Sequence, residues 1–389
     1  MMDPNLERTF RGHKDTVSSV AFAPGTPMKQ LVSAASDGCL MLWNFKPQLR
    51  AFRFLGHRGP VHHAEFAPSG QLIASASQDR TVRLWLPNAR GESTVLKGHS
   101  GAVRSVSFSK DCRQLITASD DKTVKVWSLP SKRFRCTLSG HSNWVRSAAF
   151  SPDARLAVSG GDDKLVKLWD VATQKHLRDF ADHDGSVSKV LFGGDGTCIA
   201  SCSADRTIKL WDARSYQLLQ HYPAHDDNVM SVSMHASGMY MLSSSADSTI
   251  KIWDLREGQL LYTLHGHQGP VTSSVFSPNG GFFASGGVDK MVRRRVLARQ
   301  LRHACFSIAE PHLCALLQSS TIYPSSLAQV MVWRSNLDSL VQTGPTEELE
   351  STPRPSEVGH GTVRGAQSGA PASRPRTAPA PRSTSAGAR

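Results

Sequence analysis

Histidine, a hydroxyl side chain and aspartate recur together along this chain of 389 residues, and these three residue types can form a nucleophilic relay. In one copy they are His141, Ser159 and Asp163. A base beside a hydroxyl, oriented by a carboxylate, would activate that hydroxyl for attack on an ester or an amide. The same three types, however, return seven times at a nearly constant spacing. A catalytic site needs one copy, so the repetition favours a structural role for all of them.

The spacing is regular enough to exclude chance. The aspartate recurs every 42 residues from Asp37 to Asp289, tryptophan keeps this step from Trp43 to Trp253, and histidine keeps it from His57 onward. A serine or threonine stands four residues before each of these aspartates. Four positions in register over six or seven copies indicate a repeat architecture.

The elements that must position these side chains are best seen between Gly140 and Asp170. An apolar run at 145–150 and a second at 156–159 are separated by the turn sequence Ser-Pro-Asp, and a third run at 165–170 follows an Asp-Asp pair. This pattern predicts three strands joined by tight turns. The histidine and the aspartate of each unit would then lie in the turns.

The unit resembles the WD-repeat family, in which a Gly-His to Trp-Asp segment of this length forms one four-stranded blade of a β-propeller. The resemblance covers residues 5–338. Seven units imply an all-β, seven-bladed propeller. In the family, the strand before the first Gly-His becomes the outer strand of the last blade and removes an open edge. We therefore expect residues 5–11 to close the ring.

The resemblance also implies a hydrogen-bonded network in each blade, in which tryptophan donates through its single N–H. Carried onto this sequence, the network residues are His13, Ser33, Asp37, Trp43, His57, Ser75, Asp79, Trp85, His99, Thr117, Asp121, Trp127, His141, Ser159, Asp163, Trp169, His183, Ser201, Asp205, Trp211, His225, Ser243, Asp247, Trp253, His267, Ser285, Asp289 and Trp333.

The last of these, Trp333, follows from an interruption of the seventh unit. Arg295 stands where its tryptophan is expected, and the missing strand resumes 38 residues later at Val330. We interpret residues 292–329 as an insert in the seventh blade. Its helical spacing of apolar residues is consistent with a short amphipathic helix that contacts a membrane surface or a partner. The interpretation we favour is an intron that has been retained and translated in frame.

After this repeat the composition changes. Residues 339–389 are rich in Pro, Ser, Thr, Ala, Gly and Arg and show no periodic apolar pattern. Such a segment cannot bury enough apolar surface to fold, so we predict a disordered tail.

Cations recur immediately after the turn aspartate and again three residues later. Because repetition in sequence becomes a ring in space, they are candidates for a basic rim that binds an acidic partner. The competing interpretation, which we favour, is an ordinary preference of surface turns for Lys and Arg. The candidate residues are Arg80, Arg83, Lys122, Lys125, Lys164, Lys167, Arg206, Lys209 and Lys251.

Composition limits the other function classes. The seven cysteines form no C-x-x-C pair, so we expect no disulfide framework, no metal site and no cofactor, in a reducing intracellular compartment. No apolar run is long enough to span a membrane, and the N-terminus does not have the pattern of a secretory signal. The net charge is +13, but residues 292–329 hold five Arg and one Glu, and residues 339–389 hold six Arg and four Glu. The repeats keep only a mild excess, which does not indicate nucleic-acid binding.

The sequences that link the repeats are more specific than the repeats themselves. They resemble the proteome-of-centriole family at 6–8, 46–54, 87–95, 218–222, 260–269 and 333–338. The resemblance implies a scaffold at centrioles and ciliary basal bodies that acts in centriole assembly, stability and cilium formation. Its implied partners are other centriolar proteins and microtubules. The family also carries a C-terminal coiled coil, and residues 339–389 contain no heptads, so we do not expect this chain to self-associate through one.

Two other functions remain open at this stage. An enzyme is disfavoured, because no copy of the repeat has an additional nucleophile, metal set or phosphate-binding loop. An adaptor of another complex, such as a substrate receptor of a ubiquitin ligase or a component of an RNA-processing complex, is the alternative to a centriolar scaffold.

Overall fold

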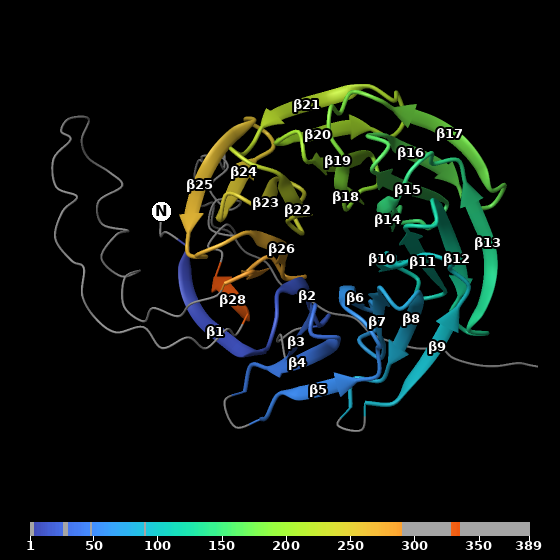
Figure 1. Cartoon of the computed structure of the whole chain (residues 1–389). Coiled ribbons are helices and arrows are strands. Elements are labelled where there is room, and N and C mark those ends of the chain that lie inside the picture. Colours follow the sequence, from blue (N-terminus) through green and yellow to red (C-terminus); the bar gives the residue numbers. More distant parts are fainter. Residues whose placement is uncertain (1–3, 26–29, 47–48, 89–90, 290–327, 335–389) are drawn as a thin grey trace, which may run out of the picture. The chain divides into compact units, whose positions relative to one another are not determined.

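The described strands form seven antiparallel sheets of four strands each, arranged as blades around a central axis (Figure 1). This computed structural model describes residues 4–25, 30–46, 49–88, 91–289 and 328–334. Within those ranges β-strand is the only regular secondary structure, and the strands are joined by turns and loops without a helix. The predicted seven-bladed propeller is therefore confirmed. The chain divides into two units, Met1–Gly344 and Pro345–Arg389, and the propeller lies in the first.

Each blade is built from consecutive strands, except the last. Blade 1 contains β2 (Val17–Phe22), β3 (Gln30–Ala35), β4 (Cys39–Asn44) and β5 (Phe52–Leu55). Blade 2 contains β6 (Val61–Phe66), β7 (Ile73–Ser77), β8 (Thr81–Trp85) and β9 (Ser93–Lys97). Blade 3 contains β10 (Val103–Phe108), β11 (Gln114–Ser119), β12 (Thr123–Ser128) and β13 (Arg133–Ser139). Blade 4 contains β14 (Val145–Phe150), β15 (Leu156–Gly161), β16 (Val166–Asp170) and β17 (Lys175–Phe180).

Blade 5 contains β18 (Val187–Phe192), β19 (Cys198–Ser203), β20 (Thr207–Asp212) and β21 (Leu218–Pro223). Blade 6 contains β22 (Val229–Met234), β23 (Tyr240–Ser245), β24 (Thr249–Asp254) and β25 (Gln259–His265). Blade 7 contains β26 (Val271–Phe276), β27 (Phe282–Gly287), β28 (Ala328–Arg334) and β1 (Asn5–His13).

Blade 7 joins the two ends of the repeat region, as the sequence predicted. Its outer strand β1 pairs antiparallel with β28, which in turn pairs with β27. In this register Trp333 lies opposite Phe283, just as Trp169 lies opposite Ala157 in blade 4. The strand after the interruption therefore continues the register of the other blades. It begins at Ala328, two residues before the start that the sequence indicated.

Burial within a blade explains why the strands differ in composition. The second strand, such as β15, is covered on both faces and is almost completely buried, so it uses small and β-branched residues. The outer strand β17 is exposed over most of its length and ends at the buried Phe180. The innermost strands contact one another in a closed cycle from β2 around to β26 and back to β2.

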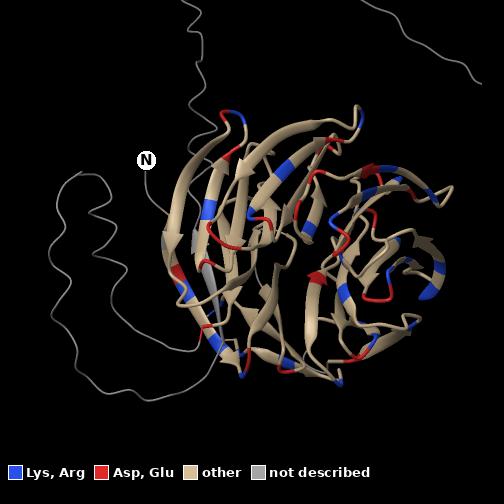
Figure 2. Cartoon of the chain, turned by 45° about the horizontal axis from the view of Figure 1, so that its top comes forward, with Lys and Arg blue, Asp and Glu red and all other residues tan. Residues whose placement is uncertain are grey.

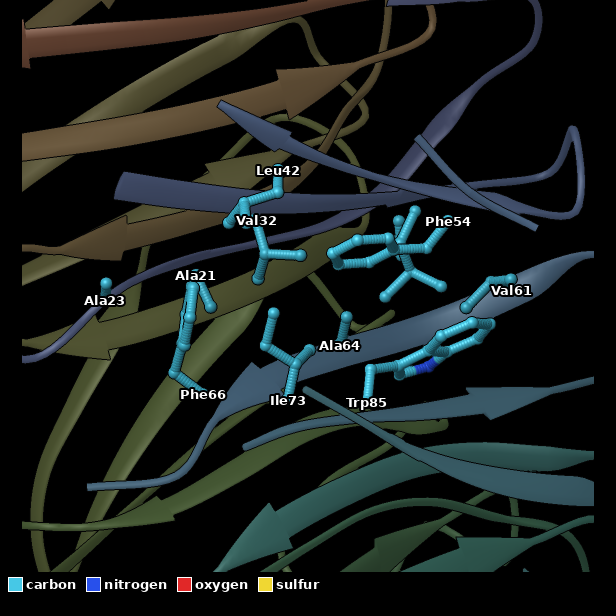
Figure 3. Close-up of a cluster of buried hydrophobic side chains, with 12 residues drawn as sticks. Ala21, Ala23, Val32, Leu42, Phe54, Val61, Ala64, Phe66, Ile73 and Trp85 are labelled. Carbon is cyan, nitrogen blue, oxygen red and sulfur yellow. The ribbon is translucent and has the colours of Figure 1, made fainter. Parts of the chain in front are cut away.

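The hydrophobic core is divided among the interfaces between adjacent blades. Figure 3 shows the cluster between blades 1 and 2, in which Phe54 stacks on Trp85 with ring centroids 5.7 Å apart. Equivalent clusters lie at the other interfaces, and the one between blades 7 and 1 includes Phe10 from the closing strand. Burial of large apolar side chains at every interface is the main stabilising contribution expected for such a ring.

Glycine allows the closest of these interfaces. A Cβ atom on Gly160 in blade 4 would lie 2.6 Å from Val187 of blade 5. A Cβ atom on Gly286 in blade 7 would lie 2.6 Å from Val17 of blade 1. The interface that closes the ring is therefore packed in the same way as an interface between consecutive repeats.

Two predictions concern segments that this structure does not describe. The proposed helix lies within 292–327 of the insert, and the predicted disordered tail comprises residues 339–389, so both lie outside the described residues. In the part of the chain that is described, no helix has the length and apolar character needed to cross a bilayer.

Candidate functional site

The network predicted in each blade is brought together around one buried hydroxyl. In blade 4, Nε2 of His141 lies 2.7 Å from Oγ of Ser159, and Nδ1 of His141 lies 2.7 Å from the carboxylate of Asp163. The indole N–H of Trp169 donates to the same Oγ over 2.7 Å. The histidine comes from the loop before the inner strand, the hydroxyl from the second strand, and the tryptophan from the third. The network thus connects three parts of one blade.

The other blades repeat this geometry. Across blades 1–7 the histidine-to-hydroxyl distance is 2.7–2.8 Å and the histidine-to-carboxylate distance is 2.7–3.2 Å. In blades 1–6 the tryptophan-to-hydroxyl distance is 2.7–3.0 Å. The side chain of Trp333 in blade 7 lies outside the described residues.

Donors and acceptors fix the protonation pattern of this network. Because tryptophan donates to the hydroxyl oxygen, the hydroxyl proton is free to point at Nε2 of the histidine. The neutral histidine then carries its proton on Nδ1 and donates it to the carboxylate. In blades 1–6 every polar atom of the network has a partner, which is the condition for a stabilising buried network; in blade 7 Oδ1 of Asp289 has none among the described residues.

The carboxyl pKa values agree with this pattern. Burial alone would raise the pKa of Asp79, but hydrogen bonds from Thr81, His57 and the backbone N–H of Arg58 outweigh burial and lower that pKa to about 2. The pKa values are also lowered at Asp37, Asp121, Asp163, Asp205 and Asp247. Burial meanwhile lowers the pKa of His57, so the ionised aspartate and neutral histidine are the favoured pair.

These contacts have the distances of a hydrolytic triad, but a substrate could not reach the hydroxyl. Ser159 is completely buried, and its oxygen already accepts the N–H of Trp169. A nucleophile needs space within about 3 Å for the reacting carbonyl carbon and for oxyanion donors. The packed tryptophan occupies that space. The arrangement therefore holds strands and turns together.

The one group of potential metal ligands among the described residues is formed by His13, at the end of the closing strand β1, with Asp37 and Cys39 of blade 1. The Cys39 thiol donates to Asp37 over 2.9 Å, just as the Thr81 hydroxyl donates to Asp79 over 2.6 Å in blade 2. Burial, with the hydrogen bond to Asp37, raises the pKa of Cys39 to about 11. Zinc requires a thiolate and usually four ligands. The thiol therefore replaces a threonine hydroxyl as a donor.

The nine cationic candidates separate into two groups. Those directly after the turn aspartate are exposed and take left-handed backbone conformations with φ between 66° and 70°; they are Arg80, Lys122, Lys164 and Arg206. The cations of the second group, which lie three residues further along the chain, donate hydrogen bonds to neighbouring strands or loops. Their acceptors are Ser93 for Arg83, Thr137 for Lys125, Asp179 for Lys167, Asp182 O for Lys209 and Ala224 O for Lys251. In the ribbon view of Figure 2, basic and acidic segments are interspersed along the strands and turns.

The central channel contains charged residues that lie outside the repeated positions. Its cavity of about 280 Å³ is lined by the inner strands and includes His63, Glu65 and Lys189. Burial raises the pKa of Glu65 to about 7, lowers that of His63 to about 3, and lowers that of Lys189. The Lys189 ammonium donates to Ser231 over 3.1 Å. The sequence did contain one indication of these residues, because Glu65 and Lys189 each stand in a strand whose other residues are apolar or neutral.

The sequence patterns also did not point to an exposed tryptophan beside two arginines that line the channel. Trp144 is 42% exposed, and the guanidinium groups of Arg104 and Arg146 lie 5.7 and 5.4 Å from its ring centre. Two hydrogen bonds to Asp120 fix Arg104, and two to Asp162 fix Arg146. An exposed aromatic ring between fixed arginines is typical of a protein-binding surface.

The fold and the repeated network define a WD-repeat propeller. The family model for "WD domain, G-beta repeat" matches seven times, at 4–44, 48–85, 91–128, 132–170, 174–212, 216–254 and 258–293. These matches cover most of the chain, so the protein belongs to this family.

The similarity to curated proteins narrows the comparison beyond the broad WD-repeat family. The chain is 62% identical over 52 residues to "POC1 centriolar protein homolog A" of Xenopus tropicalis, a match that covers 13% of this chain and 11% of that protein. It is 54% identical over 52 residues to "POC1 centriolar protein homolog B" of Xenopus laevis and 57% identical over 51 residues to homolog A of Bos taurus. The matched stretch spans only 11–12% of these relatives. These matches and the repeats together support the centriolar WD-repeat family indicated by the linking sequences.

Proposed function

We propose that this protein is a non-catalytic scaffold at centrioles and basal bodies, where its propeller supports centriole assembly, stability and cilium formation through contacts with other proteins. The observation that carries the proposal is the identity to relatives named as centriolar proteins, in a chain that folds as a seven-bladed propeller. Propellers have many unrelated partners, so the fold alone would not select this role.

The geometry supports binding rather than catalysis. The histidine, hydroxyl and aspartate groups are engaged within the blades, whereas charged and aromatic side chains such as Arg146 and Trp144 are presented at the surface. We propose centriolar proteins and microtubules as partners, without a specific nucleic acid. Co-sedimentation of the purified chain with taxol-stabilised microtubules tests the second of these partners.

Localisation tests the proposal most directly. A fluorescently tagged full chain, expressed at low level, should give two persistent dots that coincide with a centriole marker and with the base of the cilium. The tag alone is the control for background signal. A diffuse nuclear signal, or a cytoplasmic signal without dots, would contradict the proposal and favour an adaptor of another complex.

We also propose that residues 5–338 fold as one domain with an insert at 292–329. The register of β28 on β27 supports this proposal, because the strand pairs as though the insert were absent. A protein that lacks the insert should melt at the same or a higher temperature, since a shorter loop is closed at a smaller entropic cost. A much lower melting temperature would show that the insert is needed for blade 7.

A further inference from the structure

We propose that blade 2 carries an anion-binding site for an acidic or phosphorylated segment of a partner protein. The site is a hollow of about 500 Å³ whose lining includes Arg58, Arg80, Arg83 and Lys97. The inference rests on the proposed role of the propeller as a binding platform and does not depend on the centriole. It names the chemical class of the partner and the blade that binds it.

The four cations come from separate elements that meet at one end of blade 2. Arg58 follows the network histidine, and Arg80 lies in the turn between β7 and β8. Arg83 is on β8, and Lys97 on β9 lies opposite Thr81 in the strand pairing. Two turns and two strands thus supply positive charge to one hollow.

The carboxylate that lines this hollow does not neutralise it. Asp79 accepts hydrogen bonds from His57, Thr81 and the backbone N–H of Arg58. Its oxygens are therefore engaged with the buried network, and its single negative charge offsets only one of the four positive charges. Four cations against one engaged carboxylate leave a positive excess, which attracts an anion and increases its association rate.

Arg83 is held in place but has a donor without a protein acceptor. Its Nη1 donates to Ser93 over 2.9 Å, and its guanidinium carbon lies 5.7 Å from the centre of the Trp85 ring. Its Nε is buried and has no hydrogen-bond partner among the described residues. The buried Nε is out of reach of a ligand, but a guanidinium that lines the hollow and is held by Ser93 can bind the oxygens of a phosphate or a carboxylate through its remaining N–H groups.

The other blades serve as internal controls, because the repeat places different residues at the same four positions. In blade 3 they are Ser100, Lys122, Lys125 and Ser139; in blade 4 they are Ser142, Lys164, Lys167 and Ala181. At the position of Arg58, blade 5 has Asp184 and blade 6 has Asp226, and these negative charges oppose anion binding. Blade 1 has Lys14, Gly38, Met41 and Leu55. Among blades 1–6, four cations coincide only in blade 2.

The lining favours a peptide over single-stranded nucleic acid. Sequence-independent binding of single strands uses aromatic side chains on which the bases stack. The hollow contains no Phe, Tyr or Trp, and its His99 ring is hydrogen-bonded to Asp121 and Thr117. Short side chains with clustered negative charge fit this site better than planar bases.

The test compares three fluorescein-labelled peptides of one Gly-Ser-rich sequence, which carry a central phosphoserine, a central pair of glutamates, or a plain serine. Binding to the full chain is measured by fluorescence anisotropy. The key variant, R58S/K97S, introduces the residues that blade 3 itself uses at these positions. We expect it to weaken binding of the charged peptides at least about tenfold, or about 1.4 kcal/mol.

The control is K175S, which removes an exposed cation from the outer strand β17 of blade 4. It should change the affinity less than about twofold, in keeping with the weak effect of a distant surface charge. Thermal unfolding of each variant verifies that it is folded. A preference for the phosphoserine peptide identifies phosphate as the ligand, and equal binding of the glutamate peptide identifies carboxylates.

Three results would overturn the proposal. They are equal affinities for R58S/K97S and the unmodified chain, equal binding of the plain serine peptide, and tighter binding of an oligothymidine with the same dependence on Arg58 and Lys97. None of them would affect the centriolar localisation, and failure of that localisation would leave the peptide measurements valid. The two proposals can therefore fail separately.

Discussion

The buried network and the exposed rim above it come from the same repeat, yet they vary very differently from blade to blade. In the network, the positions of His141 and Asp163 have the same residue in all seven blades, and Ser159 is replaced once, by threonine. At the rim, the position of Arg58 is Lys, Arg, Ser, Ser, Asp and Asp in blades 1–6. A buried network tolerates little change because every donor needs its acceptor. Rim residues face water, so they are free to differ and to give each blade its own binding properties.

The largest effect should come from removing a network tryptophan. Trp169 is 1% exposed, and its replacement by alanine leaves a cavity between blades 3 and 4, at a cost of about 3–5 kcal/mol in the free energy of unfolding. Chemical denaturation followed by circular dichroism measures this loss. The control on the same blade is Trp144→Ala at the exposed rim, which should cost less than about 1 kcal/mol. Similar losses for the two variants would remove the distinction between network and rim.

Removing the central hydroxyl should have the next largest effect. Ser159→Ala leaves both the Trp169 N–H and Nε2 of His141 without their partner, which should destabilise the protein by about 2–4 kcal/mol. Ser159→Thr is the rescue, because blade 3 uses Thr117 in the same contacts. Differential scanning calorimetry compares the two variants. If alanine and threonine behave alike, the hydroxyl does not hold the network together.

Acid should weaken the buried network only at low pH, because the network carboxylates stay ionised well below neutral pH. The pKa of Asp79 is about 2 in the folded chain and 3.8 ordinarily, so its contribution to stability is complete above about pH 4 and is lost as the pH falls toward 2. Urea unfolding between pH 6 and pH 2.5 should show this decline. Asp79→Asn should decline less steeply over the same interval. A stability that stays constant down to pH 2.5 would contradict the assignment.

The smallest effect on stability is expected at Cys39, whose thiol takes the place of the Thr81 hydroxyl of blade 2. Cys39→Thr restores the donor used in blade 2 and should change the free energy of unfolding by less than about 1 kcal/mol. Adding zinc should leave the melting temperature of either form unchanged. A rise with zinc that the threonine variant abolishes would instead establish a metal site at His13, Asp37 and Cys39.

The sequence predicted the fold well because the repeat constrains it at several levels at once. Spacing alone gave the number of blades, and the unpaired residues before His13 predicted the closing strand that is found opposite β28. The rim was harder to predict. Lys167 and Arg80 look equivalent as charges in a sequence, but Lys167 is buried against Asp179, whereas Arg80 is exposed in a left-handed turn.

The sequence by itself determined which residues recur, and therefore how many blades form and in which register their strands pair. A unit with two apolar faces can bury both of them only against its own copies, so the period specifies the architecture. The tertiary structure alone determined which charges remain available. Arg58, Arg80, Arg83 and Lys97 are separated in sequence and meet only when two turns and two paired strands converge at the end of blade 2. Whether a charged side chain is free to bind a partner depends on the residues that pack beside it, and the spacing of residues in the sequence does not specify those neighbours.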